Sequence, residues 1–326
     1  MPSEFDLIQR YFTKPTHHTA LSVGDDAALV TVSDGMQLVV STDMSVAGTH
    51  FFHDAVPYDI GWKALAVNVS DMAAMGAQTK WATLAIALPE IDENWLAEFS
   101  RGFFACAEQF NIDLIGGDTT KGALNISVTI MGEVPIGKAL KRSSAQLGDD
   151  IWVSGTLGSA ALGLAHLQGK IKLENDVAGL DHSSTGLQAS IHALCRPIPR
   201  AALGLALRAI ATSCIDISDG LLADLGHILK ASNLGASIDL EKIPCIEMLK
   251  SNLDNAEFQT YILAGGDDYE LCFTAPQSKR EAINNLSKQL NISITRIAST
   301  RMDIGLQAMF NNKNLTLLKQ GFDHFG

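Results

Sequence analysis

The chain has 326 residues, of which 47% are hydrophobic and 18% are charged, and its formal net charge is −12. That length and apolar content suffice for a buried core and favour two domains over one. An acidic chain without a Lys/Arg cluster lacks the basic face that nucleic-acid binding requires. No apolar run approaches the roughly 20 residues that span a bilayer, and the first residues lack the pattern of a signal peptide. We expect a soluble, cytoplasmic protein that binds neither nucleic acid nor membrane, and the five scattered cysteines fit a reducing compartment.

The first part of the chain alternates between helical and strand patterns. Ser3 to Phe12 has the spacing of a capped amphipathic helix. Four further segments follow it in order: a strand at 38–41, a helix over 61–76, a strand at 81–88 and a helix over 93–110. Strands at 112–115 and 125–134 then lead into a stretch rich in Pro and Gly. We place a domain boundary in that stretch and predict domains at 1–138 and 139–326.

The second part continues the alternation. It predicts strands at 151–153, 214–217, 236–240 and 270–274, and helices from Ser159, over 200–211, over 221–231 and near 278–290. Residues 170–190 are polar and irregular, and the tail after the last helix is short. Strands that alternate with helices indicate two domains of the α/β or α+β class.

Short acidic turns recur along the whole chain. They are Gly24-Asp25-Asp26, Ser41-Thr42-Asp43, Asn68-Val69-Ser70-Asp71, Gly116-Gly117-Asp118, Asp216-Ile217-Ser218-Asp219-Gly220 and Gly265-Gly266-Asp267-Asp268-Tyr269-Glu270. Taken singly, each Asp is most simply a turn former or a helix cap. Asp71 differs because it lies inside an apolar helical pattern, where an ionised carboxylate is costly unless it is paired or binds a metal.

Considered together, these carboxylates indicate a cation site. Several carboxylates in one site repel one another unless cations are present. Oxygen ligands and substrate phosphates suit Mg²⁺, whereas the His/Cys clusters typical of zinc sites are missing. Phosphoryl transfer with bridging Mg²⁺ is the chemistry that this pattern favours.

The familiar nucleotide-binding motifs do not occur. There is no P-loop and no protein-kinase signature. The glycines at Gly155 and Gly158 follow a predicted strand but do not match the dinucleotide pattern G-x-G-x-x-G. Two interpretations of this turn stay open: a tight connection between strand and helix, or a helix N-terminus that faces phosphate.

The ordered set of turns resembles the thiamine-monophosphate kinase family, within the larger group that includes aminoimidazole ribonucleotide synthetase and selenophosphate synthetase. The resemblance runs over nearly the whole chain, and each motif is weak although the combination is specific. It implies an N-terminal α/β domain whose strands pair with those of a second subunit in a homodimer, and a C-terminal α/β domain. It also implies that ATP and several Mg²⁺ ions bind in the cleft between the domains, and that thiamine monophosphate is the acceptor.

The resemblance further assigns roles to individual positions. The implied metal ligands are Asp26, Ser41, Thr42, Asp43, Asp71, Asp118, Asp216 and Asp219. The implied nucleotide contacts are Gly117, Asp118, Arg142 and Ser218. The implied contacts to thiamine monophosphate are His50, Asp267 and Phe322. At Asp267 the family usually has Glu, so the shorter side chain here suggests an indirect or water-bridged contact.

Simpler interpretations exist for three of these residues. His50 is equally a surface histidine beside His53, Arg142 a charge in a domain linker, and Phe322 a core anchor for the tail.

No general base is expected, because a phosphate monoester with a second pKa of about 6 is mostly a dianion at neutral pH. The catalytic task is then to position two anions and neutralise charge.

Two other functions remain open. One is a related ATP-using enzyme of the same larger group, although selenophosphate synthetase would need a reactive Cys near the N-terminus and the first cysteine is Cys106. The other is a binding module that holds Mg·ATP without consuming it. An ADP assay with candidate acceptors separates these from the kinase.

Overall fold

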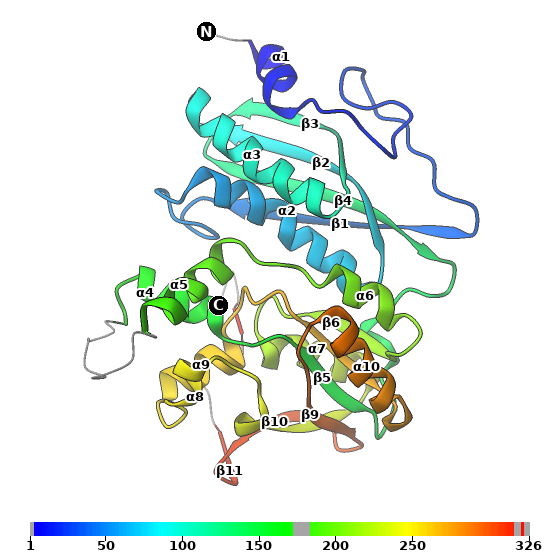
Figure 1. Ribbon diagram of the computed structural model, residues 1–326, viewed down its shortest axis with the longest axis vertical. Coiled ribbons are helices and arrows are strands. Elements are labelled where there is room, and N and C mark those ends of the chain that lie inside the picture. The colour runs from blue at the N-terminus through cyan, green and yellow to red at the C-terminus, as the bar shows by residue number, and fades with distance from the viewer. Residues whose placement is uncertain (1–2, 172–182, 316–320, 323–326) are drawn as a thin grey trace. The chain divides into compact units, whose positions relative to one another are not determined.

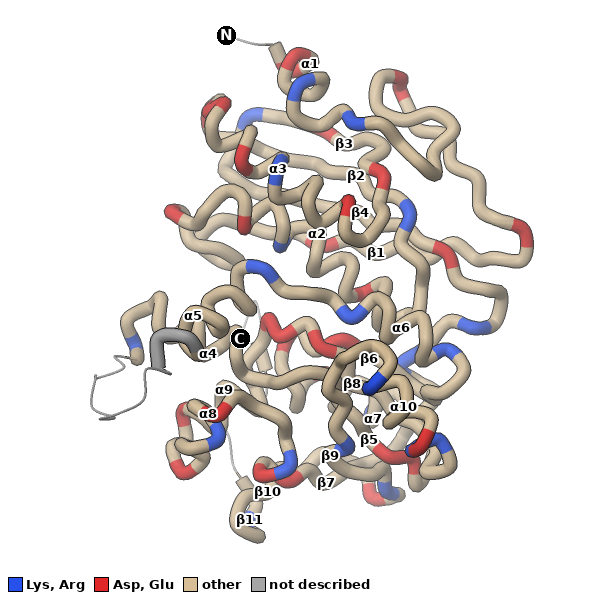
Figure 2. The backbone as a smooth tube through the Cα atoms, viewed as in Figure 1, with Lys and Arg blue, Asp and Glu red and all other residues tan. Residues whose placement is uncertain are grey.

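The computed structural model describes residues 3–171, 183–315, 321 and 322. The chain divides into two compact units, Met1–Ala139 and Leu140–Gly326, each with its own sheet and helices (Figure 1). The α/β class predicted from the sequence is confirmed. Among the described residues no helix is both long and apolar enough to cross a membrane. In Figure 2 the Lys and Arg positions are spread along the backbone of both units.

Unit 1 is a four-stranded sheet with two long helices. Its elements are α1 (Glu4–Leu7), the π-helix η1 (Ile8–Phe12), β1 (Met36–Val46), α2 (Pro57–Ala74), β2 (Gln78–Leu88), α3 (Glu93–Gln109), β3 (Asp113–Lys121) and β4 (Asn125–Pro135). The strand order is β1-β4-β2-β3, with β2 and β3 parallel and the other pairs antiparallel. Ser3 caps α1 through a capping box, as its pattern predicts.

The core of unit 1 lies between the sheet and helices α2 and α3, which run side by side (Figure 1). Apolar residues of α2, α3 and alternate positions of the strands are buried there, among them Trp81, Phe99, Phe103 and Met72. The opposite face of β1 is open: Leu38, Val40 and Met44 alternate along it and are 43%, 55% and 56% exposed. Since successive side chains of a strand point to opposite faces, β1 has one face toward α2 and one apolar face without a cover in unit 1.

Unit 2 contains a seven-stranded mixed sheet. Its strands are β5 (Asp150–Ser154), β6 (Ser213–Asp216), β7 (Gly235–Asp239), β8 (Leu271–Ala275), β9 (Ile294–Arg301), β10 (Gly305–Phe310) and β11 (Lys313–Asn314). Its helices are α4 (Ser159–Leu167), α5 (Ser183–Cys195), α6 (Ala201–Leu207), α7 (Leu221–Ser232), α8 (Glu247–Lys250), α9 (Ala256–Ala264) and α10 (Arg280–Leu290), with short 3₁₀ turns at Arg142–Ser144, Leu240–Lys242 and Gln277–Lys279. The strand order is β11-β10-β7-β9-β5-β8-β6.

Two expectations for unit 2 were wrong. The tail after α10 is not short, because β9 and β10 both belong to the sheet. β9 has a largely polar sequence, and inward positions of the two strands, such as Ile297 and Ala308, are buried. The stretch 170–190 is not irregular throughout, since α5 begins at Ser183, and its residues 172–182 lie outside the described part.

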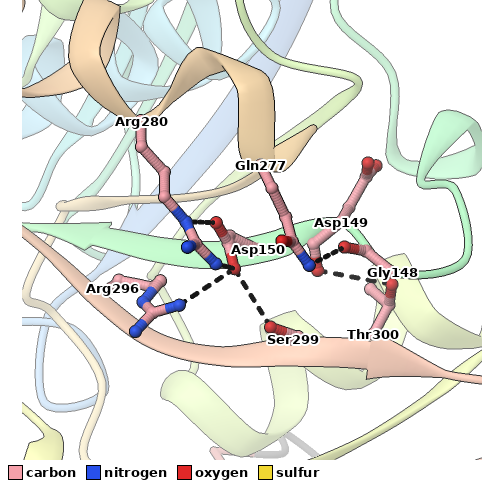
Figure 3. A network of polar contacts seen from close by, with 8 residues as sticks. All are labelled: Gly148, Asp149, Asp150, Gln277, Arg280, Arg296, Ser299 and Thr300. Atoms are coloured by element: carbon pink, nitrogen blue, oxygen red, sulfur yellow. Dashed lines mark hydrogen bonds and ion pairs between the residues drawn. The ribbon is translucent and has the colours of Figure 1, made fainter.

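A buried carboxylate joins the central strands of unit 2 to α10 (Figure 3). Asp150 on β5 is 0% exposed, and it accepts hydrogen bonds from Arg280 Nε at 2.5 Å and Ser299 Oγ at 3.1 Å and an ion pair from Arg296 at 3.4 Å. Burial by itself would raise the pKa of Asp150, but these donors outweigh it and hold that pKa below its usual value. The ionised form is therefore the one that the fold stabilises.

Replacing Asp150 by Asn should lower the free energy of unfolding at pH 7 by about 1.5–3 kcal/mol, the range for hydrogen bonds to charged groups. A carboxyl whose folded pKa is lowered contributes stability above its unfolded pKa of about 3.9 and loses it as the pH falls through the folded pKa. The gap between wild type and variant should thus shrink from pH 7 toward pH 3 in urea titrations. An unchanged gap at both pH values would contradict the assigned ion pairs.

Candidate functional site

In unit 1, the end of β1 and the helix α2 bring three of the expected metal ligands together. Ser41 Oγ donates a short hydrogen bond to Asp71 Oδ2 on α2. Burial raises the pKa of Asp43 to about 6, and the negative charge of Asp71 acts in the same direction. The carboxylates of Asp43 and Asp71 thus repel each other at a partly buried position, and the hydroxyl of Ser41 lies beside them. A hard cation bound to these oxygens would relieve the repulsion.

Thr42 and Asp118 lie on the other face of the same sheet. Thr42 Oγ1 is 2.8 Å from Thr129 Oγ1 of β4, on the open face. The register pairs Met44 with Ser127, Ser127 with Ala85 and Ala85 with Asp118, so Asp118 shares a cross-strand row with the exposed Met44. Cross-strand neighbours point to the same face, so Asp118 lies opposite to Asp43.

Distance separates these two groups as well. β1 and β3 are the two edge strands, with β4 and β2 between them. At about 4.8 Å a strand, the backbones at Asp43 and Asp118 are roughly 14 Å apart. Magnesium–oxygen bonds are only about 2.1 Å long, so one ion does not contact both carboxylates directly.

The remaining expected residues of unit 1 lie in turns and at a close approach of two strands. Asp26 is exposed in the turn after Gly24, where its N–H donates to Asp25 Oδ1. Gly117 lies against β2, and a Cβ there would be 1.8 Å from the carbonyl oxygen of Leu84, so only glycine fits. His50 follows β1, and its Nδ1 accepts the N–H of Val46 at 3.0 Å, which makes Nε2 the donor of the neutral ring. The imidazole ring of His50 is therefore partly buried and fixed by a hydrogen bond to the backbone.

In unit 2, the acidic turn after β6 pairs with the acidic turn before β8. The carbonyl of Ser218 accepts the N–H of Asp267 at 2.9 Å, and the carbonyl of Ile217 accepts that of Tyr269 at 2.8 Å. Tyr269 also donates its hydroxyl to Asp267 Oδ1 at 2.9 Å. Both Asp267 and Tyr269 have positive φ, an uncommon backbone conformation that often marks functional turns.

The same turn also contacts the C-terminal segment. The carbonyl of Asp219 accepts the N–H of Phe322 at 3.0 Å, while the side chain of Phe322 is 51% exposed. Phe322 is therefore fixed by its backbone and is not a core anchor. Asp216 is buried at the end of β6, and Arg142 is exposed at the 3₁₀ turn before β5, where its carbonyl accepts from Ser232 Oγ.

The glycine turn after β5 receives a carboxylate from the protein itself. Gly158 N–H at the start of α4 donates to Asp268 Oδ2 at 2.8 Å, and the N–H of Ala160 also acts on this group. Burial raises the pKa of Asp268 despite these donors. Since Asp268 occupies the N-terminus of α4, the interpretation as a tight strand-to-helix turn is the one that the structure supports.

One residue of this region was missed by sequence reasoning. Asp224, in the first turn of α7, accepts the N–H groups of Ser218, Asp219 and Gly220 at 3.1 Å each. Burial raises its pKa to about 7, the charge of Asp219 adds to this, and the three N–H donors oppose it. The signal was present in the sequence: an acidic residue at the fourth position of an apolar helix, directly after an acidic turn.

No three His, Cys, Asp or Glu side chains in the described ranges form a metal site by themselves. Mg²⁺ usually combines one or two carboxylates with water and substrate phosphates, and the Ser41, Asp43 and Asp71 group fits that mode of binding. The described part of unit 1 thus contains one group of oxygen donors, Ser41, Asp43 and Asp71, whose chemistry suits a hard cation.

Comparison with known proteins shows the family of the chain. Residues 24–134 match the family model described as AIR synthase related protein, N-terminal domain, and residues 146–301 match its C-terminal domain. The chain belongs to this family. It is 44% identical over 326 residues to the thiamine-monophosphate kinase of Escherichia coli strain K12, covering 99% of this chain and 98% of that protein. Within the AIR synthase-related proteins, the chain is thus a member of the thiamine-monophosphate kinase family.

Solved structures show the same relationship. The thiamine-monophosphate kinase from Stenotrophomonas maltophilia K279a superposes with a TM-score of 0.82 at 47% identity, covering 91% of this chain and 92% of that one. A second structure, AaThiL complexed with AMPPCP and TMP, superposes with a TM-score of 0.74 at 30% identity, covering 98% and 96%. The predicted family is confirmed over the length of the chain.

Proposed function

We propose that the protein transfers the γ-phosphoryl group of ATP to thiamine monophosphate in a Mg²⁺-dependent reaction, which yields thiamine diphosphate and ADP in the cytoplasm. The observation that carries this proposal is the 44% identity to a thiamine-monophosphate kinase over 99% of this chain and 98% of that protein. The conjunction of Ser41, Asp43 and Asp71 supports it, because a repelling carboxylate pair is suited to the cation that accompanies ATP.

The proposed residue roles follow the motifs. The metal ligands are Asp26, Ser41, Thr42, Asp43, Asp71, Asp118, Asp216 and Asp219. The ATP contacts are Gly117, Asp118, Arg142 and Ser218, and the contacts to thiamine monophosphate are His50, Asp267 and Phe322. The separation of Asp43 from Asp118 across the sheet supports more than one Mg²⁺ position.

The proposed mechanism is direct in-line transfer. When bound, Mg²⁺ supplies charge neutralisation for the phosphates. The carboxylates of the chain hold and orient the two anions, and no side chain needs to remove a proton because the acceptor is a dianion near neutral pH. No phosphorylated enzyme should form, and trapping a phosphoryl group on any residue would contradict direct transfer.

The test is phosphorus NMR of the purified protein with Mg·ATP and thiamine monophosphate. We expect ADP and thiamine diphosphate to appear together, and EDTA to abolish both. ATP consumption without formation of thiamine diphosphate would be consistent with a related ATP-using enzyme, but it would refute thiamine monophosphate as the acceptor. Folded protein that consumes no ATP would support the binding-module alternative.

We also propose a homodimer that forms through the open face of β1. Leu38, Val40 and Met44 expose an apolar row there, and a second copy of the same sheet is the partner that the family resemblance implies. Replacing Val40 by Glu should convert the dimer to a monomer in light scattering after gel filtration, because a charge would be buried against apolar side chains. Leu167→Glu, at an exposed leucine of unit 2, is the matched control and should stay dimeric. A dimeric Val40→Glu protein would contradict this interface.

A further inference from the structure

Asp224 holds the acidic turn after β6, residues Ser218–Gly220, through hydrogen bonds to its backbone. The residue lies in the first turn of α7, a helix of 12 residues, and is 2% exposed. One of its oxygens, Oδ2, accepts three successive backbone N–H groups, those of Ser218, Asp219 and Gly220, each at 3.1 Å. The N-cap residue of α7, Gly220, supplies no side-chain cap, and Asp224 reaches back from inside the helix to the N–H groups of the three residues that precede it.

Three converging N–H groups at a helix N-terminus normally form an anion site and commonly bind phosphate. Here the protein's own carboxylate uses them. The backbone carbonyls of the turn are also engaged, since those of Ser218 and Asp219 accept from Asp267 and Phe322. A ligand that approaches this turn therefore meets side-chain oxygens and not backbone N–H groups, and such a turn favours a cation over a bare phosphate.

The turn is fixed on its other side by contact with the end of α9. Gly220 has a φ of +124°, and a Cβ there would lie 2.7 Å from the carbonyl carbon of Ala264. The chain at Gly220 thus has little room to shift toward α9. Its hydrogen bond to Asp224 opposes a shift away from α7. Its hydrogen bonds decide where the side chains of Ser218 and Asp219 are presented.

We propose that Asp224 is a positioning residue of the enzyme, which sets the Ser218–Gly220 turn so that Ser218 and Asp219 bind the nucleotide and its Mg²⁺. This inference rests on the proposed roles of Ser218 and Asp219 in metal and nucleotide binding. It assigns no contact with the substrate to Asp224 itself, whose Oδ2 points at backbone N–H groups.

The test uses the full-length protein and two readouts: titration calorimetry with Mg·ADP, and the Mg²⁺ concentration that gives half-maximal turnover. Asp224→Ala leaves three N–H groups without their acceptor, and we expect Mg·ADP to bind at least tenfold more weakly and the half-maximal Mg²⁺ concentration to rise by a similar factor. Asp224→Asn keeps an acceptor oxygen of the same reach but loses the charge, so its affinity for Mg·ADP should lie between those of Asp224→Ala and wild type, several-fold below wild type. The KM for thiamine monophosphate should change less than either quantity.

Asp150→Asn is the matched control, because it also removes the charge of a buried carboxylate of unit 2 but one that bonds to Arg280 and Ser299 instead of the turn. It should lower the melting temperature without changing Mg·ADP affinity. If Asp224→Ala does not fold, Asp224→Asn should still bind Mg·ADP several-fold more weakly than Asp150→Asn. Wild-type affinity in a folded Asp224→Ala protein, or equal affinities of the two Asn variants, would overturn the inference.

The two proposals fail separately. Wild-type protein that binds Mg·ADP but makes no thiamine diphosphate would refute the proposed reaction, whereas the calorimetric comparison of the Asp224 variants would still decide the positioning role. Normal turnover together with unaltered Mg·ADP binding in Asp224→Ala would refute the positioning role alone.

Discussion

Asp43→Asn is expected to lower turnover by roughly 100-fold or more, which corresponds to about 2.7 kcal/mol of transition-state stabilisation. The amide keeps the size of the side chain but lacks the charge that a Mg²⁺ ligand supplies. Asp71→Asn and Asp118→Asn should behave in the same way. The measurement is initial-rate formation of thiamine diphosphate at saturating Mg·ATP.

Loss of turnover in Asp43→Asn should not come with loss of stability. The pKa of Asp43 is raised by burial and by Asp71, so its ionised form is unfavourable in the metal-free fold, and Asn removes that repulsion. The melting temperature in EDTA at pH 7.5 should therefore be no lower than that of wild type. Asp34→Asn, in an exposed turn of the same unit, is the control and should retain full activity. Wild-type turnover in a folded Asp43→Asn or Asp71→Asn variant would contradict the metal role.

Glu270→Ala should have the largest effect on stability, about 3–5 kcal/mol, because it breaks a buried ion pair and leaves one charge without its partner. Arg200 donates to Glu270 through Nε at 2.7 Å and through a second, shorter bond from Nη2, and Ser154 donates to the same carboxylate. For a protein of this size the melting temperature should fall by roughly 10 °C.

The control for Glu270→Ala is Glu281→Ala on the exposed side of α10, which should change stability by less than about 0.5 kcal/mol. Adding Arg200→Ala to Glu270→Ala should cost much less than either change alone, since the pair is lost as a unit. A loss below about 1 kcal/mol for Glu270→Ala would mean that the pair is solvated in solution.

Much of the fold was predictable because the strongest patterns are also the buried ones. Helices α2 and α3 and strands β2 and β4 carry apolar residues at the spacing of their structure, and the core lies on that side. β9 and β10 were missed because their packing depends on partners far away in sequence, β5 and β7, and not on a local pattern.

For the site, the sequence could supply the residue types but not their faces. The neighbours Ser41, Thr42 and Asp43 were treated as one set, yet strand alternation separates Thr42 from the other two. Asp118 is separated from Asp43 only by the register across four strands, which a single sequence does not show. The position of Asp224 after an acidic turn was visible in the sequence, but only the fold shows that its carboxylate accepts three backbone N–H groups of that turn.

The open face of β1 makes the activity of the protein dependent on its concentration if dimers form through that face. Leu38, Val40 and Met44 share that face with Thr42, and the row of Met44 also contains Asp118. If a second copy covers the face, the surroundings of Asp118 are complete only in the dimer, and mass action then governs how much of the protein is competent. Specific activity should fall when the enzyme is diluted below its dimer dissociation constant, and it should return when the protein is concentrated again.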